Sequence, residues 1–527
     1  MKKFWLRMLA SVLSAAMIFS AAGCDKNGGI VDNGKYLEGH IEVKIVKAGY
    51  GITWLDSIAD SYEAAFPGCT VEVKDVQDRT ALPAQIKSQS NTADIIVTVD
   101  PLFSSQTDGY LLDLSDVLKT VPEGFETSSY DRMNKSLREY YETDDGKIYQ
   151  LPWTAGFRGF LYNKSTLDKL YGEGKYTLPR TTDELLEMCS DIWQKSNQSV
   201  YPYVMSIADT VGSTVLDAFW YQYSGETSRQ CYYGYYPEKQ TDGSVKYKKC
   251  ETTEEFETML NDRGRIKSLE FYEKLFLSVE LGGYAHSDCD RMSFQEAQSA
   301  FFGYGYGTNL KECAFMLNGD WIYKEMKDKV DKTDVRFMRM PVLSSITETL
   351  ASKVSEEQLR AIVAAADEGR PYDSALGVTK AEYERIADCR FMSTPSGDAH
   401  VIAVPKLKKG GAKYDLAKQF LKYLLSAEGQ ALFVMDQQGL SMPYGFDTSG
   451  FKFNAFTESV QDVTKHGEYH MIPHENFKSP LVYAGGMVMP GYIESMFFRG
   501  SETPTAMLKR FNDRNMLIAE DLLDLIV

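Results

Sequence analysis

After the first forty residues, the pattern of hydrophobic and polar positions switches between the two-residue period of a strand and the roughly 3.6-residue period of a helix. Ile41–Lys47 alternates apolar and polar residues as a strand does, and apolar positions from Leu55 to Phe66 then recur at helical spacing until Pro67-Gly68. A strand, a helix and a largely apolar strand follow at Thr70–Lys74, Ala81–Ser88 and Asp94–Val99. This β-α-β-α-β order predicts a parallel sheet with helices on its faces. Ligands bind beyond the carboxyl ends of the strands in such sheets.

The remaining pattern is mixed. Helices are expected at Thr181–Asn197, with Thr181 or Thr182 near the N-cap, and at Asp209–Tyr223, Arg265–Leu281, Tyr414–Val434 and Thr503–Val527. Pro504 occupies the favoured first turn of the last helix. Ala399–Pro405 has the pattern of a short strand, and Ser345–Arg390 that of a charged helical insertion.

The N-terminus has the pattern of a bacterial lipoprotein signal. Lys2, Lys3 and Arg7 precede an uncharged apolar stretch, Met8–Ala22, whose 15 residues are shorter than a membrane span. The stretch ends in Ala-Ala-Gly-Cys at 21–24, which resembles a lipobox. We therefore expect residues 1–23 to be a signal peptide, Cys24 to be lipidated and residues 24–40 to be a polar tether. An ordinary signal peptide cut near Ala22 is the alternative.

The charge limits the partners of the mature chain. The full chain has a net charge of −17, and removing residues 1–23 takes away three cations and no anions, which leaves −20. This acidity argues against nucleic acid and against a basic membrane-binding face, so we expect membrane contact through the lipid on Cys24 alone. The length of 527 residues predicts two or three domains.

The cysteines do not form a metal or redox motif. Seven remain besides Cys24, none in a CxxC pair, and the odd number leaves at least one free. Cys231 and Cys250 flank a Tyr-rich, hairpin-like stretch. A two-residue turn at Asp242-Gly243 would place Cys231 opposite Glu254, so a disulfide between Cys231 and Cys250 requires a longer loop.

Several blocks resemble the family 1 extracellular solute-binding proteins of ABC importers, the group that includes maltose-binding protein. The blocks are SIADSYEAAFPGCTVEV (57–73), GKIYQLPWTAGFRGFLYNKSTL (146–167), CAFMLNGDWIYKEM (313–326), HVIAVPKLKKGGAKYDLAKQFLKYLLSAEGQALF (400–433) and FFRGSETPTAMLKRFND (497–513). Their order and spacing carry the resemblance over most of the mature chain. The 224–255 region and the 345–390 insertion depart from the family pattern.

The resemblance implies a two-lobe α/β fold of the periplasmic-binding-protein type (type II), with discontinuous lobes joined by crossing strands. Lobe 1 is expected at 41–157 and 400–440, and lobe 2 at 158–399 and 441–527. A ligand would bind in the inter-lobe cleft, shift the population towards the closed state and be presented to a membrane permease. The resemblance thus implies a monomeric, lipid-anchored binding protein for a sugar or oligosaccharide on the extracytoplasmic face of the cell membrane.

Candidate ligand-binding residues lie where the chain is expected to pass the cleft. A sugar ring stacks on aromatic faces through its C–H groups, and its hydroxyls require a few placed polar groups. On the crossing segment we select Trp153, Phe157 and Arg158, whose guanidinium is a planar donor. Hinge packing is the alternative role for Trp153 and Phe157.

Further candidates follow the expected strands and helices. Tyr50 and Trp54 come after the first strand, where they would otherwise pack on the first helix, and Asp100 follows the third strand in an Asp-Pro turn. The remaining candidates are Trp220 in an expected helix, where an aromatic residue is commonly core, Trp321 in the Asn-Gly-Asp-Trp turn, and Tyr444.

Enzyme, metal and cofactor motifs do not emerge from the sequence. It contains no HExxH, GxSxG or Walker motif, and we expect no enzymatic activity and no cofactor. His466, His470 and His474 are four residues apart, but Gly467 and Pro473 interrupt any helix, so no metal site is expected. Two alternative functions stay open: a binding protein for a glycerol-phosphate-like or other small polar solute, and a surface lipoprotein that binds glycan without transport.

Overall fold

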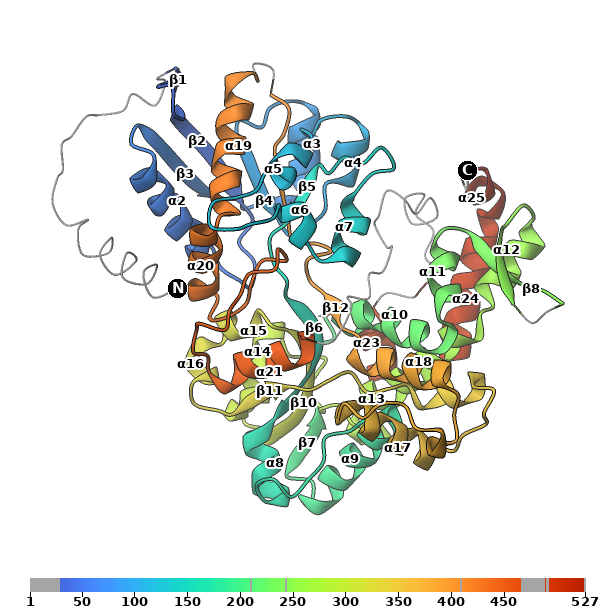
Figure 1. The fold of residues 1–527 in the computed structure, drawn as a ribbon. Coiled ribbons are helices and arrows are strands. Elements are labelled where there is room, and N and C mark those ends of the chain that lie inside the picture. The colour runs from blue at the N-terminus through green and yellow to red at the C-terminus, as the bar shows by residue number, and fades with distance from the viewer. Residues whose placement is uncertain are drawn as a thin grey trace.

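Two lobes, each built on its own sheet, make up the computed structural model (Figure 1). It describes residues 29–208, 211–241, 244–407, 410–465, 489 and 492–525. The expected signal peptide, Cys24 and the three histidines at 466, 470 and 474 lie outside the described residues. No helix within the described ranges is both long enough and apolar enough to span a bilayer.

The first sheet has six strands in the order β1-β2-β4-β13-β5, with β3 paired to β2. They are β1 (Val31–Asp32), β2 (Leu37–Ile45), β3 (Cys69–Asp75), β4 (Ile95–Thr98), β5 (Gln150–Pro152) and β13 (Val401–Ala403). β2 runs parallel to β3 and β4, which confirms the expected parallel arrangement, whereas β13 is antiparallel to β4 and β5. The alternation in β2 buries Ile41, Val43 and Ile45 on one face.

Short helices cover both faces of this sheet. They are α2 (Thr53–Ala65), α3 (Leu82–Lys87), α4 (Phe103–Thr107), α5 (Ser115–Lys119), α6 (Ser129–Arg132), α7 (Lys135–Tyr141), α19 (Ala412–Leu424) and α20 (Ala427–Asp436), with a 3₁₀ turn at Arg79–Ala81. Helices α2 and α19 contact β3 and β2. Val46, Ile96 and Ala403 form a small core with Leu82 and Ile86 of α3.

The second sheet has five strands in the order β11-β6-β10-β7, with β12 paired to β6. They are β6 (Phe157–Asn163), β7 (Val200–Tyr203), β10 (Glu312–Gly319), β11 (Val335–Phe337) and β12 (Thr394–Pro395). β6 is antiparallel to β10, β11 and β12, and it is buried along its whole length. Segments from opposite halves of the chain therefore meet in this lobe.

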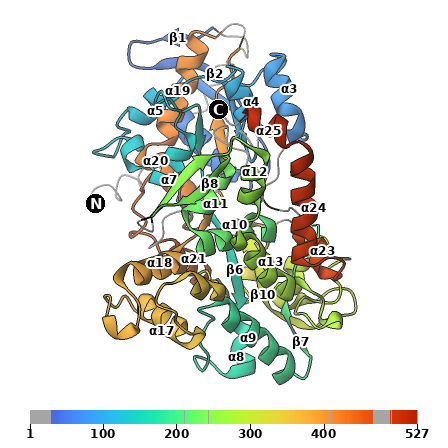
Figure 2. The same ribbon diagram turned by 90° about the vertical axis from the view of Figure 1, so that its right-hand side faces the viewer.

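The second lobe holds most of the helices (Figures 1 and 2). They are α8 (Lys164–Tyr171), α9 (Thr182–Lys195), α10 (Val211–Ser224), α11 (Glu226–Tyr232), α12 (Thr253–Leu260), α13 (Arg263–Phe276), α14 (Phe294–Ser299), α15 (Ile322–Glu325), α16 (Lys327–Val330), α21 (Ala455–Thr464), α23 (Ile493–Phe498), α24 (Pro504–Leu517) and α25 (Ala519–Leu525). A 3₁₀ turn covers Val279–Leu281 and a π-helical turn covers Ala300–Tyr304. Figure 2 shows α24 and α25 rising from this lobe to the level of the first one.

Within the described residues, three connections pass between the two lobes. They join β5 to β6, β12 to β13, and α20 to α21. The first and second of these lie side by side, because Ser396 N–H donates to the carbonyl of Gly156 and Trp153 N–H donates to that of His400. The chain thus crosses from one lobe to the other through a hydrogen-bonded bundle.

The insertion at 345–390 forms a helical unit with its own core. It contains a 3₁₀ helix (Ser344–Thr349), α17 (Glu356–Asp367), a 3₁₀ turn (Ser374–Leu376) and α18 (Lys380–Phe391). Apolar side chains such as Leu359, Ile362 and Ile386 are fully buried within it, in a cluster separate from the main core. The helical expectation for this segment is confirmed.

Some expected element boundaries are wrong. The segment Tyr414–Val434 is not one helix: α19 ends at Leu424, and the Ser426 hydroxyl accepts the N–H of Gly429 to start α20. Similarly, α13 ends at Phe276, and Ser278 caps the following 3₁₀ turn. Strand β2 begins at Leu37, within the expected tether, since Leu37 and Glu38 pair with β1 and pairing with β3 starts at Gly39.

The Tyr-rich stretch is a hairpin of β8 (Tyr235–Lys239) and β9 (Val245–Lys249). The expected turn residues Asp242 and Gly243 lie outside the described residues. Cys250 pairs with Gly234 in the backbone, whereas Cys231 belongs to the preceding helix, and neither forms a disulfide. All seven cysteines within the described ranges are buried and free.

Candidate functional site

A buried hydrogen bond joins the lobes beside the crossing segments. Tyr50 lies between β2 and α2, and its hydroxyl donates to Oδ1 of Asp320, 2.5 Å away, directly after β10 of the second lobe. The hydroxyl of Ser396 lies 2.8 Å from that of Tyr50. Gly156 passes over this contact, where a Cβ would clash with the Tyr50 hydroxyl and the Asp320 carboxylate. The close approach of the lobes therefore requires glycine at 156.

Burial changes the protonation of this junction. Desolvation raises the pKa of Asp320 to about 7, although the Tyr50 hydroxyl, the Phe157 N–H and the charge of Arg158 act in the opposite direction. Burial and the Asp320 carboxylate together raise the pKa of Tyr50 well above its usual value. Burial also lowers the pKa of the neighbouring His400 to about 4, so this imidazole is neutral at pH 7. Asp320 is the group at this junction that titrates near neutral pH.

Four of the predicted ligand-binding aromatics meet around this hydrogen bond. Trp54 and Trp153 stack with ring centroids 5.1 Å apart, and Tyr50 makes T-shaped contacts with Trp153 and Trp321 at centroid distances of 5.4 Å and 6.0 Å. His400 packs edge-on against Tyr50 and Trp153. Tyr50, Trp54 and Trp153 are at most 1% exposed, whereas Trp321 is half-buried. Trp321 is thus the member of the cluster that can offer a ring to a solute.

A cavity of about 260 Å³ lies beside Trp321 on the second lobe. Its lining comprises Ala208, Val211, Ser293, Phe294, Gln298, Asn318 and Trp321. Phe294 is 45% exposed, so a second aromatic face is open to solvent there. None of these lining residues carries a charge. Two aromatic side chains and two amide side chains in an uncharged lining suit a neutral, hydroxyl-bearing molecule.

Gln298 supplies an unused acceptor in this lining. Its side chain is 1% exposed and Nε2 donates to Oε2 of Glu325 at 2.6 Å, while Oε1 has no hydrogen-bond partner among the described residues. A buried amide oxygen without a donor costs about 1–3 kcal/mol, and a ligand hydroxyl can remove that cost. Sequence reasoning missed Gln298 and Phe294. The Ser293–Glu296 capping box marks the start of α14, but it carries no signal for ligand binding.

The other predicted site residues lie elsewhere. Asp100 is exposed and pairs with Arg79 at 3.2 Å, and Phe157 packs on Phe337 with centroids 4.7 Å apart. Arg158 donates to the carbonyl of Pro395 at 2.7 Å and to the Asp398 carboxylate at 3.2 Å. Pro395 ends β12 and Asp398 lies in the connection from β12 to β13, so this guanidinium ties the start of β6 to the second crossing segment.

Trp220 and Tyr444 are also engaged by the protein. Trp220 is buried in α10 and its indole N–H donates to Asp262 at 2.6 Å. The Tyr444 hydroxyl donates to the carbonyl of Pro152 at 2.8 Å. Among the described residues, no group of three or more His, Cys, Asp or Glu side chains is placed to hold a metal ion.

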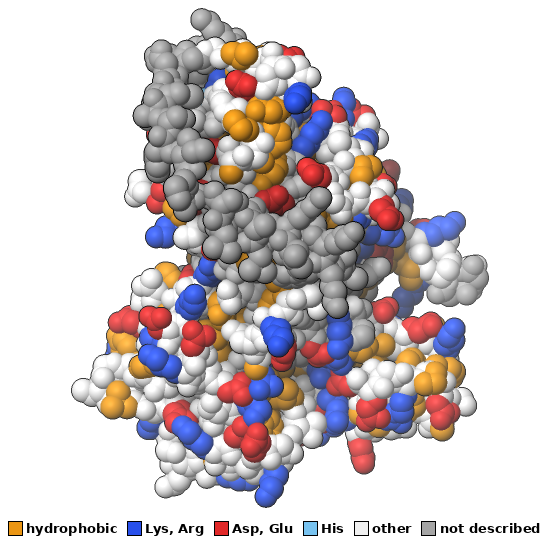
Figure 3. All heavy atoms as spheres, turned by 60° about the vertical axis from the view of Figure 1, so that its left-hand side comes forward, with side chains coloured by type: hydrophobic (Ala, Val, Ile, Leu, Met, Phe, Trp, Pro, Cys, Tyr) orange, Lys and Arg blue, Asp and Glu red, His pale blue; other side chains and the backbone are white. Residues whose placement is uncertain are grey.

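Charged side chains do not dominate the face shown in Figure 3. Over the part of the chain that the structure describes, Lys and Arg side chains are interspersed with Asp and Glu on the second lobe in this view. No single basic area of the kind that binds a polyanion stands out there.

The sequence profile of bacterial extracellular solute-binding proteins matches residues 47–431. No curated protein sequence matches the chain. The GacH receptor of Streptomyces glaucescens, solved unliganded and with acarbose, superimposes with a TM-score of 0.57 at 13% identity, over 92% of this chain and 99% of that one.

Two further solved structures also match this chain over nearly its whole length. MalE from Bdellovibrio bacteriovorus bound to maltotriose matches with a TM-score of 0.53 at 17% identity, over 91% of this chain and 100% of that one. RafE in complex with raffinose matches with a TM-score of 0.56 at 14% identity, over 90% of this chain and 98% of that one. At these identities the three structures establish the two-lobe fold.

Proposed function

The chain belongs to the bacterial extracellular solute-binding protein family, and from that premise we propose that it is the substrate-binding protein of an ABC importer for a sugar or oligosaccharide. The resemblance read from the sequence and the expected two-lobe α/β fold are confirmed by the family match and the solved structures. The three structural neighbours described above were solved with acarbose, maltotriose and raffinose, which supports a carbohydrate ligand.

The uncharged cavity beside Trp321 carries this proposal. A sugar ring stacks on the Trp321 face, and one of its hydroxyls donates to the unpaired Oε1 of Gln298. A phosphate ester would require cationic donors or a helix N-terminus aimed at it. None of the described residues that line this cavity is cationic, and the N-terminus of α14, which does line it, is already capped by Ser293 and Glu296. Both observations favour a neutral sugar over the glycerol-phosphate-like alternative.

Capture proceeds by lobe closure in this proposal. Lobe 1 is taken as residues 41–157 and 400–440 and lobe 2 as 158–399 and 441–527, with the first boundary at the start of β6 and the other two in later connections between the lobes. The ligand binds both lobes in the closed state and one in the open state, which shifts the population towards closure. The closed form delivers the sugar to the permease, and the lipid on Cys24 keeps the protein on the extracytoplasmic face of the membrane.

Isothermal titration calorimetry tests the ligand and the site together. The full chain is titrated with maltotriose, raffinose, a chitin oligosaccharide and glycerol 3-phosphate. We expect one-to-one binding of a sugar, weakened at least tenfold, or about 1.4 kcal/mol, in Trp321→Ala. Trp193→Ala is the matched control, because Trp193 stacks on Tyr201 away from the cavity and its loss should leave affinity unchanged.

Two further measurements separate the transport proposal from a surface glycan-binding role. The radius of gyration from small-angle scattering should fall when the sugar binds, and uptake of the labelled sugar by cells should require the gene. Binding without compaction and without an uptake defect would instead support a glycan-binding lipoprotein. Binding of glycerol 3-phosphate alone would refute the carbohydrate assignment.

A further inference from the structure

A second cavity, of about 610 Å³, lies on the second lobe where the 345–390 insertion meets the rest of the lobe. Its wall is drawn from six segments: strand β6, the loop before α9, strand β11 with the residues after it, the end of α17, the end of α18, and α21. We call it the arginine cavity, because Arg180, Arg336, Arg339 and Arg390 all line it. Its volume falls in the range of about 300–1,000 Å³ that is typical of small-molecule sites.

Two of the arginines build a rigid wall. Arg390 is 4% exposed and holds both carboxylate oxygens of Asp367, each at 2.9 Å, while its Nη1 donates to the carbonyl of Met340 at 3.1 Å. Arg339 joins the same carboxylate at 3.0 Å and reaches Asp462 of α21 at 3.2 Å. Asp367 therefore accepts three arginine N–H groups, which is most of what a carboxylate can accept.

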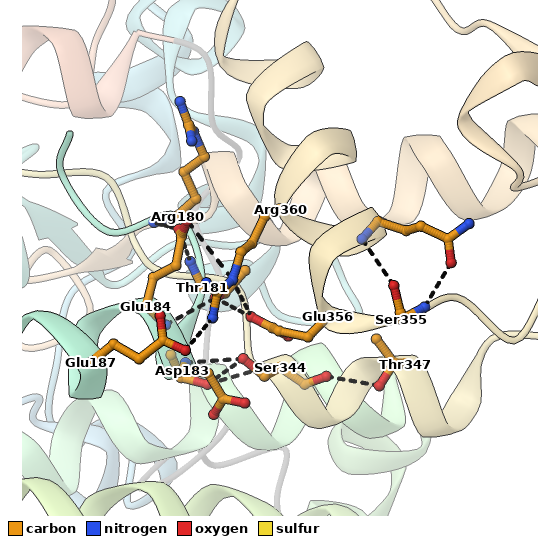
Figure 4. Close-up of polar contacts among 12 residues, drawn as sticks. Arg180, Thr181, Asp183, Glu184, Glu187, Ser344, Thr347, Ser355, Glu356 and Arg360 are labelled. Atoms are coloured by element: carbon orange, nitrogen blue, oxygen red, sulfur yellow. Dashed lines mark hydrogen bonds and ion pairs between the residues drawn. The ribbon is translucent and has the colours of Figure 1, made fainter.

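Donors remain when these pairs are complete. The Arg339 Nε is buried and has no hydrogen-bond partner among the described residues. The guanidinium of Arg180 makes no hydrogen bond or ion pair with any described side chain or backbone group. Figure 4 shows it extending away from the network of Glu184, Glu187 and Arg360. The nearby carboxylates of Glu187 and Glu356 already pair with another arginine, Arg360, at 2.7 Å and 3.1 Å.

The chemistry of the missing partner follows from these donors. An arginine offers five N–H groups in a planar fork that matches the oxygens of a carboxylate or a phosphate. The rings of Tyr162 and Tyr176 form part of the same wall and give an apolar surface for the body of a ligand. We propose that the arginine cavity is a second binding site, for a small organic anion that carries a carboxylate or phosphate group.

This site is separate from the cavity beside Trp321. The two cavities share no lining residue, and the Trp321 cavity has no charged lining, whereas the arginine cavity is lined by four arginines and three carboxylates, those of Asp367, Glu458 and Asp462. Two of the lining residues, Asp367 and Arg390, come from the insertion, so the segment that departs from the family pattern helps to form the site. The proposal of an anion site can therefore be tested independently of the proposal of a sugar site.

Isothermal titration calorimetry on the full chain tests the site with glucuronate, glucose 6-phosphate and inorganic phosphate, and with glucose as the neutral control. We expect saturable one-to-one binding of glucuronate or a phosphate probe, weakening with salt, and none of glucose in this cavity. Which probe binds distinguishes a carboxylate ligand from a phosphate ligand.

Arg180→Gln should weaken anion binding at least tenfold, and Arg180→Lys, which keeps the charge but loses the fork, should weaken it less. Neither change removes a bond between the side chain and the described protein, so both should fold. Arg370→Gln is the matched control, because Arg370 is an exposed arginine of the insertion that pairs with Glu368 outside the cavity. Its affinity for the anion should equal that of the unmodified chain.

Three results overturn the proposal: no saturable binding of any of the three anions, equal binding by Arg180→Gln and the unmodified chain, or loss of anion binding in Trp321→Ala. The last result would place the anion in the cavity beside Trp321. Loss of sugar binding in Trp321→Ala with anion binding intact is the outcome expected if both proposals hold.

Discussion

The hydroxyl of Tyr50 lies 2.5 Å from Oδ1 of Asp320, and this hydrogen bond connects the two lobes. Neither residue is exposed to solvent. Trp321 follows Asp320 in the chain and lines the uncharged cavity, so the junction also fixes the start of the turn that presents the candidate sugar-binding ring. A change at this contact should alter both stability and ligand binding.

Asp320 should make stability depend on pH near neutrality. Its pKa is raised to about 7 in the folded chain and returns to about 4 on unfolding. Between about pH 4 and pH 7, the carboxyl is therefore protonated in the folded state and ionised in the unfolded state. The stabilisation is complete below about pH 4 and is lost as the pH rises to about 7, with a slope of up to about 1.4 kcal/mol per pH unit. Urea unfolding from pH 5 to 8 measures this slope.

Asp320→Asn should remove that part of the slope, because the amide does not titrate. Asp328→Asn, a change at an exposed carboxylate of α16, should leave the slope as in the unmodified chain. Identical pH profiles for the unmodified chain and Asp320→Asn would show that Asp320 is ionised throughout this range in the folded state.

Gly156→Ala should weaken the junction through steric overlap. The new methyl group would displace the Tyr50 hydroxyl or the Asp320 carboxylate, since both lie within contact distance of an ideal Cβ at 156. Overpacking of this kind costs about 1–3 kcal/mol in unfolding free energy. We also expect lower sugar affinity, because the crossing segments set how the lobes close.

Thermal unfolding and sugar titration measure the two effects of Gly156→Ala. Gly29→Ala is the control, as nothing lies within 4 Å of a Cβ there and its backbone has no left-handed strain. An unchanged melting temperature in Gly156→Ala would show that the junction can relax around a methyl group.

Local sequence patterns predicted much of the fold. Thr181 does cap α9, with Glu184 completing a capping box, and Pro504 does start α24, because capping depends on residues within one turn. The break between α19 and α20 was missed, since the apolar face continues across Leu425 and only the hydroxyl of Ser426 marks the new start.

The candidate site was less accessible to sequence reasoning. Tyr50, Trp54, Trp153 and Trp321 do meet, but their ligand contacts stay a prediction. Arg158 finds its carboxylate at Asp398, 240 residues away, and no local pattern predicts so distant a pair. Gln298 stands out only because its Oε1 is buried and has no donor among the described residues, which is a property of the folded lobe.

Cys24→Ser should release the protein from the membrane. The residue lies outside the described part of the chain, and the prediction rests on the apolar stretch that precedes it. Two acyl chains give stable anchoring where one is marginal, so their loss should move the protein from the membrane fraction to the soluble one. Fractionation with immunoblotting measures this, with Cys69→Ser, a change at a buried cysteine, as the control. Retention of Cys24→Ser in the membrane would contradict lipidation at this position.

Asp367→Asn should destabilise the second lobe where the insertion meets it. Burial raises the pKa of Asp367, but the hydrogen bonds and charges of Arg390 and Arg339 outweigh burial and hold that pKa below its usual value. The ionised carboxylate therefore stabilises the fold above its unfolded pKa, and this stabilisation is lost as the pH falls through the lower, folded pKa.

Removing the charge at 367 leaves two arginines without their shared anion, and Arg390 is almost completely buried. Breaking a buried ion pair from one side costs about 3–5 kcal/mol, so we expect a loss of that order in unfolding free energy at pH 7. Glu368→Gln removes the neighbouring charge, which pairs with Arg370 at the surface, and should change stability by less than about 1 kcal/mol. Equal effects of the two substitutions would mean that Arg339 and Arg390 find other acceptors when Asp367 is neutral, and that the insertion is fastened mainly by its apolar contacts.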